Sequence, residues 1–232
     1  DSTTSTNISC HGLNDGTATV SVSSSGGGSG TTGNYCSSSP LLSMACNMEN
    51  VSLTGDSISI NNATTGLADQ YEDYTNLYAD LTTGQPYTIT VSLGVEPSIT
   101  QPAAYPSGGK VFIDWNIDGD FNDPGEEVGI IPFGPSSTTT IPFTVPFSGA
   151  YGATRMRIVS QFLNNIPVSS IGPCDVGVMA NPVYIQPWFG ATEDYSIVIS
   201  AANITATYNW SNGLTTDSIS GLSTGNYTID IT

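Results

Sequence analysis

The sequence predicts an all-β protein built as a β-sandwich. Three observations lead to this fold class: helical periodicity is nearly absent, short segments alternate apolar with polar residues, and turn-rich stretches separate those segments. With 232 residues and 38% hydrophobic content, the chain can bury one large core or two small ones. Its 11 Tyr, 7 Phe and 3 Trp recur along most of the chain, so an ordered protein is expected.

The expected strands follow from the two-residue period that sends alternate side chains to opposite faces of a sheet. In chain order they are Ala18–Val22, Tyr87–Leu93, Val111–Trp115, Ile141–Val145, Met156–Phe162, Tyr195–Ile199, Ala206–Trp210 and Tyr227–Ile231. Each is short and is bounded by turn residues, as is typical of sandwich strands.

Two changes in composition indicate that one domain is inserted into another. Ser23–Gly33 contains only Ser, Gly and Thr, which is typical of a flexible linker, and a weaker break lies at Ser200–Asn203. The two flanks are short, polar and rich in Ser and Thr, so neither can bury a core alone. We therefore expect a discontinuous domain of residues 1–30 plus 201–232 and an inserted domain of residues 34–200.

The charge balance limits the classes of partner. Twenty acidic residues against three basic ones give a formal charge of −17, which repels phosphate backbones and anionic lipid headgroups. No apolar run approaches the length of a bilayer. Nucleic-acid binding and membrane insertion are therefore not expected, and cations are the natural partners of this surface.

The strongest chemical signal is the run Asp114–Glu127, which holds six of the 20 acidic residues and no basic one. Oxygen-bearing side chains at alternate positions, with Gly119 at a sharp turn, can bring hard ligands to one Ca²⁺ ion. The expected ligands are Asp114, Asn116, Asp118, Asp120, Asp123 and Glu126. Mg²⁺ is disfavoured because so many carboxylates exceed its small octahedral shell. The alternative is a solvated acidic turn that holds no ion.

Two arginines are expected to form a structural clasp. Arg155 and Arg157 are two residues apart on an expected strand, so both point to one face. The acidic pair Glu193-Asp194 on a neighbouring strand would then neutralise them, because the guanidinium group fits a carboxylate bidentately. The alternative is a pair of solvent-facing arginines.

Nothing in the sequence supports an enzyme. Gly221–Gly225 fits a G-x-S-x-G nucleophile turn, but that fold needs a later histidine and the only one is His11. Acidic pairs admit a glycosidase, yet no cleft can be assigned to them. Carbohydrate binding is a second hypothesis, with Tyr105, Trp188 and Phe189 as a stacking surface or, equally, as core residues.

Four cysteines without a CxxC pair favour two disulfides over a zinc site, with three connectivities open. They are Cys10, Cys36, Cys46 and Cys174.

The two flanks together resemble an SprB-type repeat, an Ig-like β-module that occurs in tandem in large gliding-motility adhesins. The residues that carry this resemblance are Cys10, Gly12, Asn14–Gly16, Trp210–Gly213, Gly221-Leu222 and Gly225–Thr228. About 170 residues stand where that family has a short turn.

The insert resembles a GEVED domain, a β-sandwich common in proteins exported by type IX secretion. The matching motifs, in order, are Tyr35-Cys36, Tyr71–Thr75, Ile113–Asp123, Gly125-Glu126, Thr154–Arg157 and Gly190–Tyr195. Ala191-Thr192 departs from the family, which has Glu-Val there. Together the resemblances imply an Ig-like β-sandwich split by an inserted, jelly-roll-like sandwich.

The GEVED resemblance also implies a disulfide between Cys36 and Cys174, since the family often has a cysteine at each place. A local bridge between Cys36 and Cys46 is the alternative.

The expected function is structural and adhesive. The resemblances imply a calcium-stabilised repeat of a secreted bacterial cell-surface adhesin or filament, located outside the cell and exported by type IX secretion. Its partners would be neighbouring copies of the same repeat, joined in register through Asp1–Thr4 and Asp230–Thr232, and surface glycans or other cells.

Overall fold

A computed structural model describes residues 2–9, 12–21, 34–43, 46–64, 69–94, 106–134, 137–147, 150–162, 167–180, 183–185, 187, 189–202 and 206–232. Within these ranges the fold is all-β, as the sequence predicts, with one short 3-10 helix, η2 (Val168–Ser170). None of the described helices is long and apolar enough to span a bilayer.

The chain forms two compact units. Unit 1 combines Asp1–Ser25 with Asn203–Thr232, and unit 2 is Gly26–Ala202. Unit 1 is therefore assembled from segments at both ends of the sequence. The expected linker Ser23–Gly33 lies outside the described residues.

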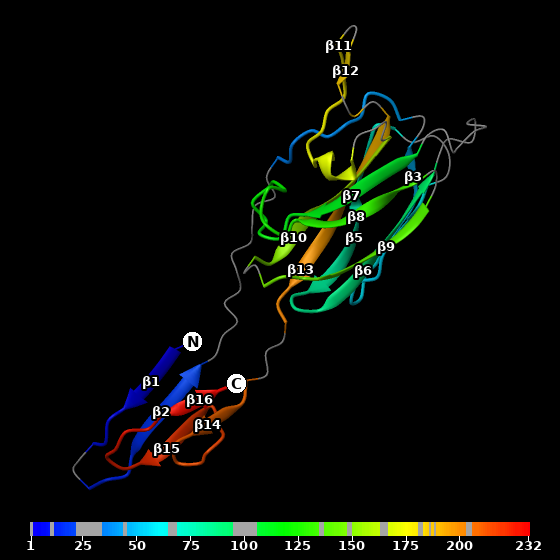
Figure 1. Cartoon of the computed structure of the whole chain (residues 1–232). Helices are drawn as coiled ribbons and strands as arrows, with labels where there is room; N and C mark the ends of the chain where they lie inside the picture. Colours follow the sequence, from blue (N-terminus) through cyan, green and yellow to red (C-terminus); the bar gives the residue numbers. More distant parts are fainter. Residues whose placement is uncertain are drawn as a thin grey trace. The chain divides into compact units, whose positions relative to one another are not determined.

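Unit 1 contains two small sheets, seen in Figure 1. One has the order β1-β2-β15, and the other pairs β14 with β16. Their bounds are β1 (Ser2–Thr6), β2 (Gly16–Ser21), β14 (Tyr208–Trp210), β15 (Ser218–Leu222) and β16 (Ile229–Ile231). The alternation at Ala18 and Val20 was a sufficient signal for β2, whereas β1 consists of hydroxyl residues and was not expected.

The core of unit 1 draws on both ends of the sequence. Val20 packs in one buried cluster with Trp210, Ile219 and Leu222. Trp210 is only 5% exposed, and its indole N–H donates to the Thr216 carbonyl oxygen at 2.8 Å. Removing the N-terminal strands would therefore expose the apolar residues of the C-terminal ones.

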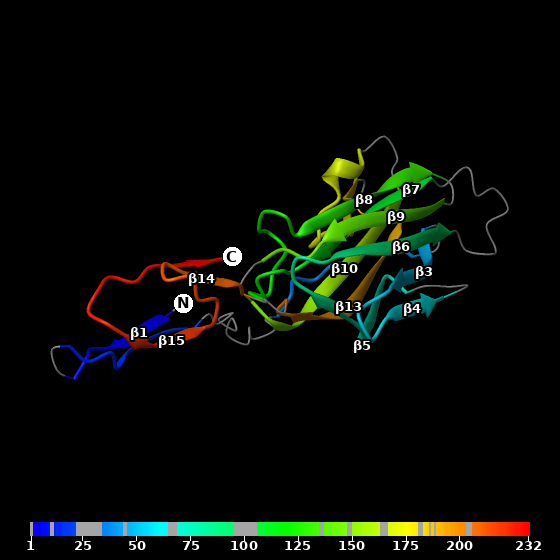
Figure 2. The ribbon, with the colours of Figure 1, turned by 90° about the horizontal axis from the view of Figure 1, so that it is seen from below.

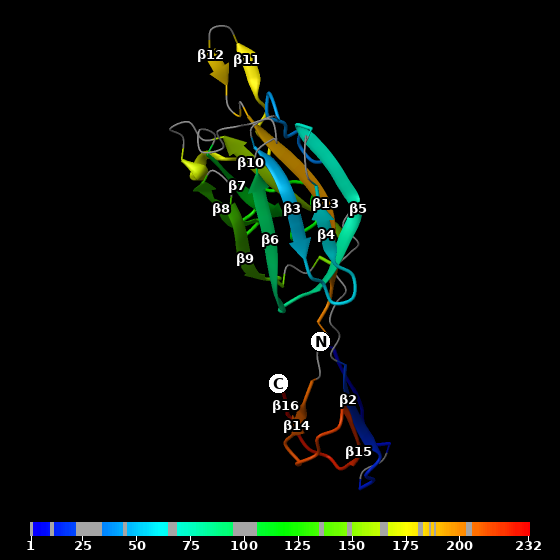
Figure 3. The same ribbon diagram turned by 90° about the vertical axis from the view of Figure 1, so that its right-hand side faces the viewer.

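Unit 2 is a β-sandwich of a five-stranded and a four-stranded sheet, which face each other in Figures 2 and 3. The five-stranded order is β5-β13-β10-β7-β8, and the four-stranded order is β4-β3-β6-β9. A separate hairpin pairs β11 with β12. The bounds are β3 (Asn47–Leu53), β4 (Ile60–Ala63), β5 (Tyr71–Thr82), β6 (Pro86–Gly94), β7 (Ser107–Ile113), β8 (Glu127–Gly134), β9 (Ser137–Thr144), β10 (Gly152–Phe162), β11 (Val178–Ala180), β12 (Val183–Ile185) and β13 (Gly190–Ser200).

The sandwich core lies between the two sheets. Ile89 and Val91 of β6 meet Ile158 of β10 and Ile197 of β13 in one cluster of fully buried side chains. The expected strand Val111–Trp115 ends two residues early, at Ile113, because the chain then leaves the sheet to form the acidic loop.

The outer face of the five-stranded sheet is also covered, which alternation did not predict. Residues 34–43, named here the covering segment, run beside β13: Ser39 forms a parallel bridge with Val176, and Leu42 forms one with Phe189. Every residue of β7 is buried, because Phe112 on its outer side packs against Phe121, Ile171 and, from the covering segment, Tyr35. A strand buried on both faces shows no apolar–polar alternation.

A disulfide joins Cys36 of the covering segment to Cys174, 138 residues later, with 5.5 Å between the Cα atoms. The pairing implied by the GEVED resemblance is thus confirmed, and a Cys36–Cys46 bridge is excluded. Cys46 is a buried free thiol whose pKa is raised by burial to about 12. Cys10 lies outside the described residues.

Deleting residues 1–24 should unfold unit 1 and leave unit 2 intact, because Val20 is part of the core around Trp210. In a ¹H–¹⁵N spectrum, the indole resonance of Trp210 should move to its unfolded position while the resonances of the sandwich stay in place. A Trp210 indole signal that is unchanged by the deletion would show that the two ends fold separately.

Candidate functional site

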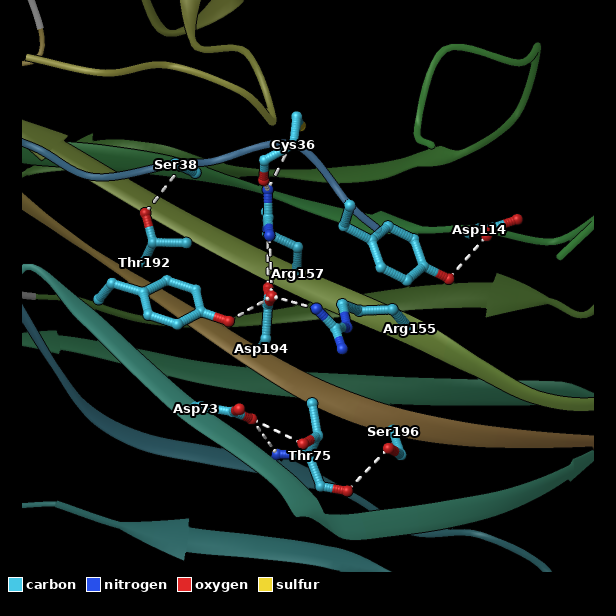
Figure 4. A network of polar contacts seen from close by, with 12 residues as sticks. Cys36, Ser38, Asp73, Thr75, Asp114, Arg155, Arg157, Thr192, Asp194 and Ser196 are labelled. Carbon is cyan, nitrogen blue, oxygen red and sulfur yellow. Dashed lines mark hydrogen bonds and ion pairs between the residues drawn. The ribbon is translucent and has the colours of Figure 1, made fainter. Parts of the chain in front are cut away.

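The outer face of the five-stranded sheet holds a buried ion pair between Arg157 of β10 and Asp194 of β13 (Figure 4). The two residues are directly opposite each other in the antiparallel register. Nε of Arg157 donates to Oδ1 of Asp194 at 2.7 Å, and Nη2 donates to Oδ2 at 2.8 Å. The Arg157 side chain is 2% exposed and the Asp194 side chain 0%, so the pair is a bidentate one removed from solvent.

The remaining terminal nitrogen of Arg157, Nη1, binds the covering segment and the turn that holds Cys174. Nη1 donates to the carbonyl oxygens of Cys36 at 2.8 Å and Pro173 at 2.9 Å. One guanidinium group therefore ties the sheet to both sides of the Cys36–Cys174 disulfide. We call Arg157, Asp194 and these two carbonyl groups the clasp.

Arg155 and Tyr71 complete the environment of the Asp194 carboxylate. Nη1 of Arg155 lies 3.1 Å from Oδ2 of Asp194, and the Tyr71 hydroxyl donates to the same oxygen at 2.9 Å. Arg155 is 26% exposed, so its contribution is screened more strongly than that of Arg157. Both expected arginines thus bind the same residue of the acidic pair.

The other acidic residue, Glu193, does not face the arginines, which corrects the expectation that it shares in the clasp. Adjacent residues of a strand point to opposite faces of the sheet. Asp194 points outward to Arg157, and Glu193 lies on the core side, where the Tyr195 hydroxyl donates to its Oε2 at 2.6 Å. Glu193 therefore takes no part in the clasp.

Two aromatic side chains connect the arginines to the acidic loop. The Tyr35 ring lies under the Arg155 guanidinium at 4.5 Å, and the Phe121 ring lies near that of Arg157 at 5.2 Å. The two rings are in contact, with centroids 5.1 Å apart. The Tyr35 hydroxyl then donates to Oδ2 of Asp114 at 2.7 Å. Contacts therefore run without a gap from the clasp to the first residue of the loop.

Asp114 organises the loop from within. Its Oδ1 accepts the backbone N–H of Ile117 at 2.7 Å, and its Oδ2 accepts that of Gly119 at 3.0 Å. The residue is completely buried. Positive φ angles at Ile117 (59°) and Gly119 (96°) let the backbone curl around this carboxylate. The structure thus assigns Asp114 backbone partners at both of its oxygens, whereas the sequence indicated only a cation ligand.

Glu126 closes the loop in the same way. Its Oε1 accepts the backbone N–H of Trp115 at 3.1 Å, and its Oε2 accepts that of Asp123 at 3.1 Å. Burial, with a smaller contribution from the nearby charges of Asp114 and Asp123, raises the pKa of this carboxyl to about 7. Asp114 and Glu126 therefore hold the two ends of the loop together, and a role for them as cation ligands stays a prediction.

The outer rim of the loop carries the residues best placed to bind a cation. Carboxylate oxygens of Asp118, Asp120 and Asp123 all lie within 4.8 Å of one another. The Asn116 amide donates to Asp118 at 2.9 Å and to Asp123 at 2.6 Å, so it fixes their orientation. Carboxylate oxygens are ligands that Ca²⁺ prefers. Of the six expected ligands, Asp118, Asp120 and Asp123 come together, and Asn116 binds two of them through its amide nitrogen.

A groove of about 380 Å³ lies beside this rim. Trp115, Asn116, Asp123 and Pro124 contribute one side of its lining, and Thr144, Pro146 and Phe147 contribute residues from the end of β9 onward. Phe147 is 74% exposed and lies over the turn at Gly84. The groove combines an exposed aromatic ring with carboxylate and amide groups.

Of the three aromatic residues left open between a stacking surface and the core, Phe189 is a core residue, buried against Phe162 and Cys46. Tyr105 and Trp188 lie outside the described residues. Phe147 was not singled out from the sequence, and Tyr35 was named only within the Tyr35-Cys36 motif. For Tyr35 the only available signal was its position beside Cys36, and for Phe147 it was its place between polar residues after a strand.

Asp194→Asn should destabilise unit 2 by about 3–5 kcal/mol, because it leaves the buried charge of Arg157 without a counter-charge. Arg155→Met is the matched control and should cost about 1 kcal/mol or less, since that side chain is partly solvated. Urea unfolding of both variants measures the difference. Equal losses in the two variants would contradict the assignment of the clasp to Arg157 and Asp194.

Comparison with known proteins identifies a family for part of the chain. A search of curated proteins finds no match. Residues 108–198 match the family model described as the GEVED domain, a range that covers β8, β9 and β10, most of β7 and β13, the acidic loop, and all of the clasp except the Cys36 carbonyl group.

Proposed function

We propose that this chain is a structural and adhesive module of a secreted bacterial cell-surface adhesin or filament, stabilised by Ca²⁺. The observation that carries the proposal is the acidic loop. Its backbone is fixed by two buried carboxylates, while Asp118, Asp120 and Asp123 gather on its rim. Three like charges in one place are unfavourable unless a cation neutralises them.

The placement of the bases supports the need for an external cation. The sequence has three Lys and Arg residues, and all of them are engaged away from the rim. Lys110 pairs with Glu127 at 2.8 Å, while Arg155 and Arg157 pair with Asp194. None of these charges compensates Asp118, Asp120 and Asp123, so a divalent ion from solution is the natural counter-charge.

The disulfide supports a location outside the cell. Cys36–Cys174 closes a long segment of unit 2, and such bonds persist in oxidising compartments. Closing so long a loop contributes about 4–5 kcal/mol in the chain-entropy account. Together with the GEVED match, this supports export by type IX secretion to the cell surface.

The role of the module is mechanical in this proposal, and no catalysis is assigned to it. The buried carboxylates near the loop bind backbone N–H groups and thereby stabilise a rigid sandwich. The split Ig-like unit would serve as an SprB-type repeat within a gliding-motility adhesin. Its partners would be neighbouring copies of the same repeat in an extracellular filament, and surface glycans or other cells.

Ca²⁺ should raise the melting temperature of the chain, and a chelator should lower it again, because an ion that binds only the folded state stabilises it by mass action. At a concentration about 100 times its Kd, the gain would be about 2.7 kcal/mol. Asp118→Ala should remove most of this response, whereas Asp69→Asn, an exposed carboxylate of the same unit outside the loop, should retain it. Identical melting with Ca²⁺ and with chelator would refute the role of calcium.

The groove beside the loop favours carbohydrate binding as a second candidate function. An exposed aromatic ring can stack on the apolar face of a sugar, and the neighbouring Asn116 and Asp123 can accept or donate hydrogen bonds to its hydroxyl groups. A neutral glycan also avoids repulsion by the charge of −17.

Phe147→Ala should weaken glycan binding by roughly 3- to 10-fold without changing the melting temperature, because an aromatic contact is worth about 0.5–1.5 kcal/mol and this ring is mostly exposed. A glycan array followed by titration of the bound sugars measures the effect. Phe133→Ala, another exposed phenylalanine that is not part of the groove lining, is the matched control. Binding that is unaffected by Phe147→Ala, or no binding on the array, would exclude this groove as the site.

A further inference from the structure

Two glutamates lie side by side at the margin of the core of unit 2, where Glu193 is fully buried and Glu72 is half-buried. Glu72 of β5 and Glu193 of β13 are register partners in the parallel pairing of these strands. Partners in a parallel ladder have their side chains on the same face of the sheet. The next residues on that face, Tyr74 and Tyr195, are also register partners, and their rings stack at 5.6 Å.

The hydrogen bonds of the two carboxyl groups follow the same pattern. Tyr74 donates its hydroxyl to Oε1 of Glu72 at 3.0 Å, and Tyr195 donates to Oε2 of Glu193 at 2.6 Å. The second oxygen of each group is buried and has no hydrogen-bond partner among the described residues: Oε2 of Glu72 and Oε1 of Glu193. A buried acceptor without a partner is costly, and two adjacent ones are more so.

Ionisation of both Glu72 and Glu193 would make this arrangement still less favourable. Glu193 is completely buried, and an ionised carboxylate there would be repelled by an ionised Glu72 on the neighbouring strand. The bases of the sequence do not relieve this repulsion, because Lys110 pairs with Glu127 and the arginines pair with Asp194 on the opposite face of the sheet.

The other groups around the pair do not supply a compensating charge. On β4, the Asn62 amide donates to the Tyr195 hydroxyl at 2.8 Å. Asp69, which precedes β5, adds a further negative charge that raises the pKa of Glu72. Ile158 of β10, the register partner of Glu193 on its other side, is apolar.

We infer that Glu72 and Glu193 share a single proton and form an acid–carboxylate hydrogen bond that joins β5 to β13. One proton between Oε1 of Glu193 and Oε2 of Glu72 satisfies both unpartnered oxygens and removes one of the two charges. The arrangement is that of paired carboxylates that cannot both ionise at close range.

The direction of the pKa shifts agrees with this geometry. Burial and, to a smaller extent, the charge of Glu72 together raise the pKa of Glu193 to about 8, and burial also raises the pKa of Glu72. In the unfolded chain the ordinary pKa of 4.5 applies to Glu193. The folded state therefore holds a proton that the unfolded state has released, and this contribution to stability is lost as the pH rises from about 4.5 to about 8.

Loss of the shared proton should destabilise the first half of β5 more than the rest of the sheet. This strand is at the edge of its sheet, and its ladder with β13 shifts register between Tyr195 and Ser196, directly after the tyrosine pair. Loss of the proton would place two negative charges under the few ladder bonds that precede this bulge. Alkaline pH should thus loosen Tyr71–Tyr78 before it affects the centre of the sheet.

The test compares the full chain with Glu193→Gln between pH 5 and pH 9, in chelator. A proton that is bound only in the folded state changes the equilibrium constant of unfolding by up to tenfold per pH unit. The unfolding constant of the wild type, divided by that of the variant, should therefore rise by up to tenfold per pH unit until about pH 8. Glu193→Gln keeps a neutral donor at all pH values and should lack this dependence. Glu49→Gln, a glutamate of β3 that contacts Asn47, is the matched control.

A ¹³C titration of the glutamate side-chain carboxyls in the wild-type chain tests the sharing directly. Glu72 and Glu193 should titrate with a common inflection, and Glu72→Gln should move that of Glu193 to lower pH. Independent titrations, an unmoved Glu193 in Glu72→Gln, or parallel stability curves would overturn the inference. If the pH dependence of stability in the Asp118→Asn variant responds to Ca²⁺, then a cation and not a proton lies between Glu72 and Glu193. That result would also overturn the inference.

Discussion

The ion pair between Arg157 and Asp194 connects the five-stranded sheet of unit 2 to the covering segment and the disulfide outside it. A guanidinium group buried on the face of a sheet requires partners in all directions, and Arg157 finds them in Asp194, Cys36 and Pro173. The covering segment, the disulfide and the sheet are held by this one group. Burial of such a pair is costly unless each donor is satisfied, and here the geometry meets that condition.

Strand β13 has a different electrostatic environment on each of its two faces. On its outer face, Asp194 of β13 pairs with two arginines, and on its core face Glu193 lies beside a second carboxyl group. The contrast follows from the alternation of side chains along a strand. The acidic loop repeats the principle, because Asp114 points inward to the backbone while Asp118 lies on the exposed rim. The buried carboxylates shape the module, and the exposed ones are available to a cation.

The sequence predicts those parts of the structure that depend on local pattern. β6 follows the alternation of Ile89, Val91 and Leu93, and Gly119 stands at the sharp turn expected of it. The acidic loop stood out by its charge density. The two-residue period allows only one member of Glu193-Asp194 to face Arg155 and Arg157, and the expectation that both would pair with them overlooked this constraint.

Features that depend on burial from distant segments could not be predicted. β7 and the first half of β13 are buried on both faces, because Tyr35, Ser38 and Phe121 come from other parts of the chain to cover the outer face of the sheet. Asp114 and Asp118 are alike in sequence, and only the fold separates their roles.

The proposal that the acidic loop binds Ca²⁺ is tested most directly with terbium. Terbium bound at the loop would be excited through the nearby Trp115 indole and displaced by Ca²⁺. The account predicts sensitised emission that Ca²⁺ displaces and that Asp118→Asn abolishes, whereas emission that is absent in the wild type or unchanged in the variant would contradict it.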